Sequence, residues 1–184
     1  MDNVVFQHGD ITKLPFVSKD ELVNHIPQLS NVIETYKDYG TSTYEQLFTE
    51  EQREGAVELN CTYLKSAILW RDEQGFRLEA VDLQAQISPV YAIVAEDIDH
   101  DDIIDLLLFG NQYGLRPDIG RLDGNRGVFL KGKPEGGFKF IPSTESGLFV
   151  TGQVRDATFI NGPNDIRQLI IGRNYLPAQV FNLR

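Results

Sequence analysis

The ten-residue stretch DIIDLLLFGN, residues 102–111, recurs in altered form as DIRQLIIGRN, residues 165–174. The two copies lie 63 residues apart, and each combines an apolar run with a closing asparagine. A second pair repeats at about 60 residues: AILW at 67–70 with GF at 75–76, and GVFL at 127–130 with GF at 137–138. Two matches at nearly one period predict two copies of a β unit of about four strands.

A four-stranded unit repeated in sequence is typical of the blade of a β-propeller. Each blade has a face that it cannot bury alone, so successive blades must pack on one another. About two blades fit into residues 55–184, fewer than a closed propeller contains. We therefore expect a mainly β protein with a partial β-propeller, completed by a longer chain, a second copy or the helices. A β-sandwich with a chance internal similarity is the alternative.

The pattern of apolar and polar residues changes near residue 55. Residues 1–54 are predicted to form an N-terminal helical segment, with helices near 18–26, 30–39 and 41–52, the first opened by a capping box of Ser18 and Glu21. Residues 55–184 alternate short β-rich runs with Gly, Asp, Asn and Pro clusters, which is typical of a β meander. We expect strands near 56–63, 66–71, 75–80, 90–95, 103–109, 127–131, 137–141, 153–160, 167–172 and 178–182.

The composition excludes several classes of function. The 184 residues carry 17 Lys and Arg against 27 Asp and Glu, a formal net charge of −10. This balance argues against binding to nucleic acid or to an anionic membrane, both of which require a basic patch. The single cysteine, Cys61, rules out a disulfide framework and a zinc site built on cysteines. Neither a membrane span nor an export signal is expected from the sequence as it stands.

Residues 97–105, with the sequence DIDHDDIID, form the most chemically specific segment. Carboxylates stand at positions 1, 3, 5 and 9, namely Asp97, Asp99, Asp101 and Asp105. Oxygen ligands that converge in this way suit Ca²⁺, which takes six to eight of them. An EF-hand is excluded because it requires a glutamate at position 12, where this chain has Leu108. The alternative is a solvated acidic turn, and the second repeat keeps only Asp165 of the acids.

Together these residues resemble the FG-GAP/VCBS repeat family, whose blades carry an Asp-x-Asp-x-Asp-Gly-x-x-Asp calcium loop before an apolar strand. The wider chain is similar to the C-terminal portion of VCBS repeat-containing proteins of the Bacteroidetes envelope, through the segments 86–91, 120–123, 145–148 and 154–156. The resemblance implies a propeller, calcium at the four aspartates, no assigned enzymatic activity, and a cell-envelope or extracellular location. Asp102 stands where the family has glycine. Asp tolerates a positive φ less well than glycine, so we expect weakened calcium binding.

The connection from Asn111 to Arg126 is a candidate surface for a protein or glycan partner, because long loops are where binding tends to reside. Its candidate partner-binding residues are Tyr113, Arg116, Asp118, Arg121, Asp123, Asn125 and Arg126. In the alternative interpretation, Arg116 and Arg121 pair with the acidic loops and hold one blade against the next.

The function expected from the sequence is a non-catalytic binding or scaffold module, rigidified by one structural calcium ion. Two alternatives stay open. One is a glycan-active enzyme that uses carboxylates at the rim of the propeller. The other is a self-assembling fragment that associates through its open strand edges.

Overall fold

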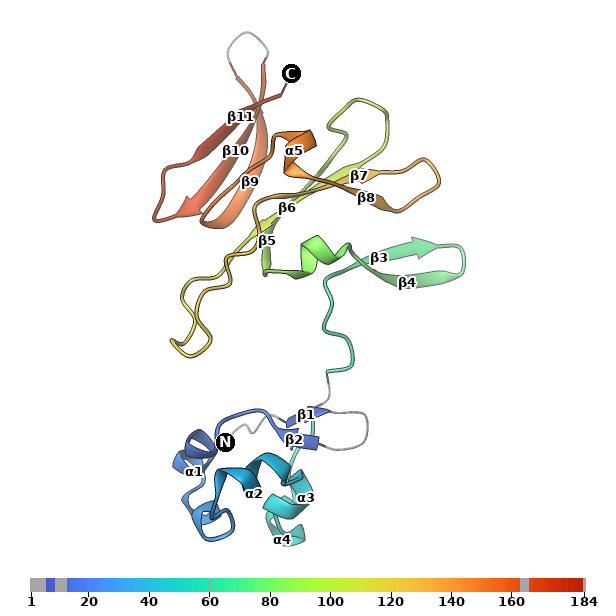
Figure 1. Ribbon diagram of the computed structural model, residues 1–184. Helices are drawn as coiled ribbons and strands as arrows, with labels where there is room; N and C mark the ends of the chain where they lie inside the picture. Colours follow the sequence, from blue (N-terminus) through green and yellow to red (C-terminus); the bar gives the residue numbers. More distant parts are fainter. Residues whose placement is uncertain (1–5, 9–12, 60, 163–165, 184) are drawn as a thin grey trace. The chain divides into compact units, whose positions relative to one another are not determined.

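The computed structural model describes residues 6–8, 13–59, 61–162 and 166–183 (Figure 1). The chain divides into two compact units, residues 1–61 and residues 62–184. In the described part of the chain, no helix is both long enough and apolar enough to cross a membrane.

The first unit pairs one small hairpin with a set of short helices. In chain order its elements are β1 (Phe6–His8), β2 (Lys13–Pro15), α1 (Lys19–His25), the 3₁₀ helix η1 (Pro27–Asn31), α2 (Tyr36–Thr41), α3 (Tyr44–Leu47) and α4 (Glu50–Arg53). Its core consists of the buried side chains Leu22, Leu29, Ile33, Tyr39 and Leu47. The predicted helical character is confirmed, but the helices are shorter than expected.

Threonine caps explain why the helices are short. Ser18 caps α1 as predicted, accepting a hydrogen bond from the Glu21 backbone N–H at 3.2 Å. Thr35 begins α2 within the span predicted as one helix, 30–39. Thr49 divides the predicted helix 41–52, because it forms a capping box with Gln52 that begins a new helix, α4. A threonine side chain that accepts hydrogen bonds from free N–H groups favours the start of a new helix at these positions, although the apolar spacing continues through them.

The second unit is an antiparallel β structure, and its described residues form nine strands, one 3₁₀ helix and one helical turn. Its elements are β3 (Ala67–Asp72), β4 (Gly75–Ala80), η2 (Leu83–Gln86), β5 (Val90–Glu96), β6 (Asp105–Gly110), β7 (Val128–Gly132), β8 (Phe138–Ile141), α5 (Ser143–Ser146), β9 (Gln153–Asn161), β10 (Arg167–Asn174) and β11 (Gln179–Asn182). Nine of the ten predicted strands are present. The tenth, at 56–63, is wrong: residues 56–59 and 61–63 form no strand, and residue 60 lies outside the described residues.

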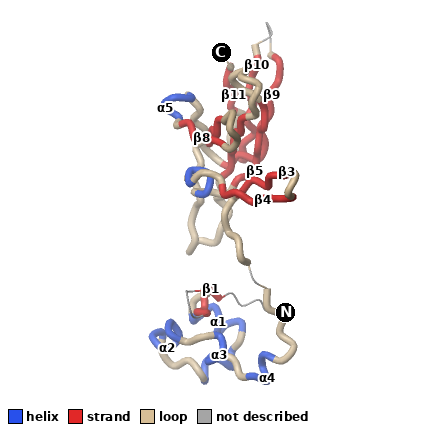
Figure 2. Tube along the Cα trace, turned by 90° about the vertical axis from the view of Figure 1, so that its right-hand side faces the viewer, coloured by secondary structure: helices blue, strands red, loops and turns tan. Residues whose placement is uncertain are grey.

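The nine strands form one hairpin, β3-β4, and two meanders, β5-β6-β7-β8 and β9-β10-β11. Each of these sheets is antiparallel and none is closed on itself. The four-stranded sheet lies between the other two (Figures 1 and 2). Residues from β5, β6, β9 and β10 form one apolar core that includes Phe109 and Ile171, both 0% exposed. On the opposite face, Leu108 and Leu130 pack with Ala85 of η2. Because β6 is buried on both faces, its sequence reads as a continuous apolar run.

The outward face of the three-stranded sheet differs from the equivalent face of the four-stranded sheet. On β5 and β6, the face turned toward β9-β10-β11 carries the apolar residues Ala92, Val94, Leu107 and Phe109. By the internal repeat and the strand register, the matching positions on β9 and β10 are Asp156, Thr158, Ile170 and Gly172. Asp156 and Thr158 are exposed. The same face also carries Ile160 and Val180, which are 41% and 50% exposed, so it presents a mixed polar and apolar surface.

Candidate metal centre and binding loop

The acidic loop connects β5 to β6 and brings three of its predicted ligands together. Asp97, Asp99 and Asp105 each offer a carboxylate oxygen, and these oxygens all lie within 4.8 Å of one another. Asp105 is buried, Asp97 is half-buried and Asp99 is exposed. Oxygen atoms at this spacing can hold one cation, with Asp105 as the innermost ligand.

Backbone hydrogen bonds orient two of these carboxylates. Asp97 accepts the N–H groups of Asp101 and Asp102, at 3.1 and 2.9 Å, so the loop folds around its side chain. Asp105 accepts from the N–H of Ile98 at 3.2 Å and from the N–H of Gly132 on β7 at 2.8 Å. The Asp105 carboxylate thus ties the loop to its own sheet.

Asp101, the fourth predicted ligand, lies outside the group of three. Its carboxylate pairs with the Lys131 ammonium of β7 at 3.1 Å, and the same ammonium also bonds Asp99. The two aspartates raise the pKa of Lys131. Lys131 in turn lowers the pKa of Asp101. A cation already supplied by the chain therefore balances part of the negative charge of the loop.

The backbone of the loop has the conformation expected where the family carries glycine. Asp102 has φ = 65°, in the left-handed region that favours glycine. His100 has φ = 62°. Aspartate visits this region more readily than bulkier residues do, yet the conformation remains costly relative to glycine.

The buried Asp105 carboxyl should leave a pH signature. Burial raises its pKa, more than the N–H bonds from Gly132 and Ile98 lower it. The folded state therefore binds this proton more tightly than the unfolded state, and the resulting stabilisation is present at low pH and lost as pH rises through the raised pKa. The free energy of unfolding is measured across this pH window in the presence of a metal chelator. As the pH rises, it should decrease more for the wild type than for Asp105→Asn. Parallel pH profiles for the two proteins would contradict the assignment.

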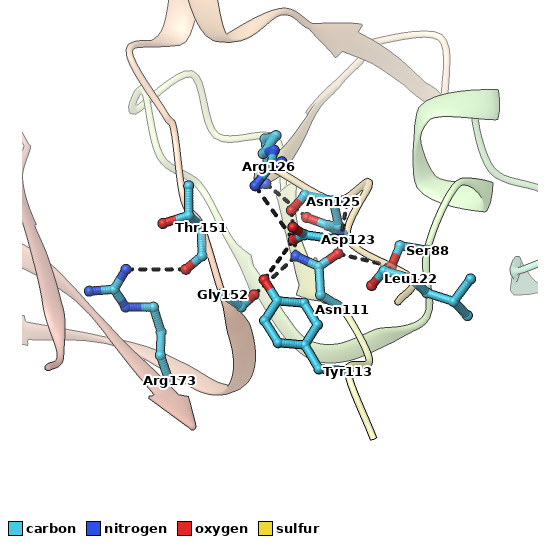
Figure 3. Close-up of polar contacts among 11 residues, drawn as sticks. Ser88, Asn111, Tyr113, Leu122, Asp123, Asn125, Arg126, Thr151, Gly152 and Arg173 are labelled. Carbon is cyan, nitrogen blue, oxygen red and sulfur yellow. Dashed lines mark hydrogen bonds and ion pairs between the residues drawn. The ribbon is translucent and has the colours of Figure 1, made fainter. Parts of the chain in front are cut away.

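Asn111, which directly follows β6, is the centre of a buried polar network (Figure 3). It is 1% exposed and has φ = 85°. Its Oδ1 accepts from the Ser88 hydroxyl and from the Asn125 N–H, both at 2.9 Å. Its Nδ2 donates to the carbonyls of Asn125 and Gly152, at 2.8 and 3.0 Å. One side chain thus joins the start of β5, the end of the long loop and the start of β9.

Arginine completes this network at the backbone of Asn111. The Arg155 guanidinium donates to the Asn111 carbonyl at 3.0 Å and to the Gln112 and Gln153 side chains, both at 2.9 Å. The same guanidinium lies 4.1 Å from the centre of the Tyr91 ring. These bonds hold β9 beside the start of the long loop.

The seven candidate binding residues divide into three groups. Tyr113 donates to Asp123 at 2.7 Å, Arg126 approaches the same carboxylate at 3.5 Å, and Arg121 lies 4.9 Å from the Tyr113 ring centre. Arg116 pairs with Asp118 at 2.9 Å within the loop itself. Asn125 is 4% exposed, and its side chain binds the chain at Leu108 and Gly127.

Only the exposed candidates are placed to contact a partner. Of the seven candidates, the exposed ones are Arg116, Asp118 and Arg121, and beside them Ile119 is 54% exposed. Asn125 holds the loop in shape instead. Arg116 pairs with Asp118 and Arg121 lies over the Tyr113 ring, so both arginines have contacts within the loop itself.

Sequence reasoning missed Asn111, Lys131 and Arg155 as organising residues. One signal was present: the repeat aligns Asn111 with Asn174, so an asparagine stands at the end of the apolar run in both copies. Lys131 carried no such signal, since only the register of β7 beside β6 brings it to the acidic loop. Comparison of the chain with protein-family models, with curated proteins and with solved structures returned no match.

Proposed function

We propose that the second unit is a partial, open β-propeller of the FG-GAP/VCBS type that acts as a non-catalytic binding or scaffold module. The observation that carries this proposal is the succession of meanders at the period of the sequence repeat. β5 begins at Val90 and β9 at Gln153, 63 residues later, and the two sheets share one core. Successive meanders packed face to face are the arrangement of propeller blades.

The proposed propeller is partial because the described strands form separate sheets, none of which closes on itself. The outward face of β9-β10-β11 would be the contact face for a further blade. Its exposed Ile160 and Val180 suit such a contact, whereas burial of Asp156 there would cost the desolvation of a carboxylate.

The binding surface of this module is the exposed part of the loop between Asn111 and Arg126. Arg116, Asp118 and Arg121 alternate charge beside the apolar Ile119. The buried Asn111 network fixes both ends of this loop, so a protein or glycan partner would meet a surface that is already ordered. Preorganisation of this kind reduces the entropy lost on binding.

A calcium ion at Asp97, Asp99 and Asp105 would rigidify the same unit from the other end of β6. Calcium must share Asp99 with the Lys131 ammonium, so the affinity should be modest. In protein freed of metal with chelator, calcium at 100 times its dissociation constant should add about 2.7 kcal/mol to the free energy of unfolding. Calorimetric titration and thermal unfolding with and without calcium measure this directly.

Two variants should move the calcium affinity in opposite directions. Asp97→Asn with Asp99→Asn should abolish the stabilisation, because two of three ligand charges are lost. Lys131→Met should tighten binding roughly tenfold, about 1.4 kcal/mol, because it removes the competing ammonium. Glu50→Gln with Glu51→Gln removes the same number of charges from α4 and serves as the matched control. A calcium effect that persists in the aspartate variant, or that weakens in Lys131→Met, would count against the site.

A further inference from the structure

An open polar cavity lies between two hairpin regions of the second unit, away from both the acidic loop and the loop at 111–126. Its volume is about 210 Å³, and its lining residues are Trp70, Arg77, Glu79, Glu135, Gly136 and Gly137. The first three belong to the β3-β4 hairpin and the others to the turn between β7 and β8. This volume lies below that of pockets for drug-sized ligands.

Trp70, the single tryptophan of the chain, forms the apolar wall of this cavity. Its ring stacks on Phe138, with centres 5.9 Å apart and planes 22° apart. The Arg77 guanidinium lies 6.0 Å from the centre of the indole. These contacts on both hairpins fix the indole in place, so the wall exists before any ligand arrives.

The polar groups of the cavity combine donors and acceptors with little net charge. Arg77 pairs with Glu79 and lowers the pKa of that carboxyl, which therefore stays ionised. Lys133 also acts on Glu79, so two cations balance the carboxylates of Glu79 and Glu135. The Trp70 indole N–H contributes to the lowered pKa of Glu79. The same N–H is buried and has no well-aligned hydrogen-bond acceptor among the described residues.

The turn that closes one side of the cavity is rich in glycine. Its sequence is Lys-Pro-Glu-Gly-Gly at 133–137, with a hydrogen bond from the Gly136 N–H to the Lys133 carbonyl at 2.9 Å. Gly136 and Gly137 have φ of 92° and 77°. A Cβ on Gly137 would lie 3.9 Å from a carboxylate oxygen of Glu79. Glycine at this position thus leaves the space beside Glu79 open.

From this geometry we infer that the cavity is a subsite for one neutral sugar residue. A sugar ring carries hydroxyl groups that both donate and accept, and C–H groups that contact an aromatic wall. An ion pair beside a further carboxylate offers both kinds of hydrogen-bond partner to neighbouring hydroxyls. A cationic ligand fits less well, because Arg77 already occupies the position beside the indole. This inference is independent of the calcium loop.

Fluorescence of the single tryptophan provides a local test, since Trp70 lines the cavity itself. The full chain is titrated with glucose, galactose, mannose and N-acetylglucosamine, and with disaccharides of these sugars. Sorbitol serves as an acyclic control and tetramethylammonium as a cationic probe. At least one ring sugar should give a saturable change with millimolar affinity, and sorbitol and tetramethylammonium should not. A tighter response to disaccharides than to monosaccharides would identify a glycan chain as the source of the sugar residue.

Variants then connect the response to the cavity. Arg77→Gln and Glu135→Gln should each weaken the affinity at least tenfold, as measured by fluorescence and by calorimetry. Arg71→Gln and Glu73→Gln remove the same charges from the same hairpin outside the cavity and should leave the affinity unchanged. The proposal is overturned if no ring sugar gives a saturable response, if only tetramethylammonium does, or if the two pairs of variants behave alike.

Discussion

Replacing Asn111 with alanine is expected to lower the free energy of unfolding of the second unit by about 4 kcal/mol. The change leaves three partners without a bond, namely the N–H and carbonyl of Asn125 and the Gly152 carbonyl, while the Ser88 hydroxyl keeps the Leu122 carbonyl as its acceptor. Each such group costs about 1–3 kcal/mol when no water replaces the lost bond. Alanine is also strained at φ = 85°. Denaturant unfolding followed by the fluorescence of Trp70 reports on this unit.

Asn111→Gly separates the two causes. Glycine loses the same hydrogen bonds but accepts the positive φ, so it should be less destabilised than alanine by about 1 kcal/mol. Asn111→Asp keeps the shape and both acceptor bonds, but it places a buried carboxylate oxygen against the carbonyls of Asn125 and Gly152, so near neutral pH it should be at least as destabilised as alanine. A loss below about 1 kcal/mol for alanine would show that water or a rearranged loop replaces the network.

Replacing Phe109 with alanine should cost about 3–5 kcal/mol, because its side chain is 0% exposed in the core shared by two sheets. The cavity left behind lies between β5-β6 and β9-β10, so the three-stranded sheet β9-β10-β11 should also lose stability. Backbone amide exchange of Leu169 and Ile171 on β10 should accelerate together with that of β6. Exchange in the β3-β4 hairpin should change less.

Phe76 offers the matched control for this variant. It is the same residue type in the same unit, but 72% of it is exposed. Phe76→Ala should therefore change the free energy of unfolding by less than about 0.5 kcal/mol. Equal losses for the two variants would mean that the shared core does not carry the stability of the sheet pair.

The β part of the fold was largely predictable because its signals are local. Alternating runs between Gly, Asp and Pro clusters located nine strands, and the repeat indicated which strands correspond. The error at 56–63 has a physical explanation. Val57, Leu59 and Leu64 have the composition of a strand, yet all three are highly exposed, so no neighbouring strand or core rewards an extended pairing there. Strand propensity without a partner does not make a strand.

The candidate site was predictable only in part. The spacing of Asp97, Asp99 and Asp105 was sufficient to bring three carboxylates together. The role of Asp101 depends on Lys131, which lies 30 residues away in sequence and is placed by the pairing of β6 with β7. The cavity at Trp70 also depends on a tertiary contact, the stack of Trp70 on Phe138. No local sequence pattern predicts either contact.

The mixed outward face of β9-β10-β11 has a consequence for how this architecture can change over evolutionary time. A duplicated repeat inserted between the second and third sheets would present apolar faces to both neighbours and could be accommodated. A repeat packed on the outward face of the third sheet would find the exposed Ile160 and Val180 suitable, but it would also have to bury Asp156. Growth at this face is therefore expected to begin with a substitution of Asp156 or with a cation placed opposite it.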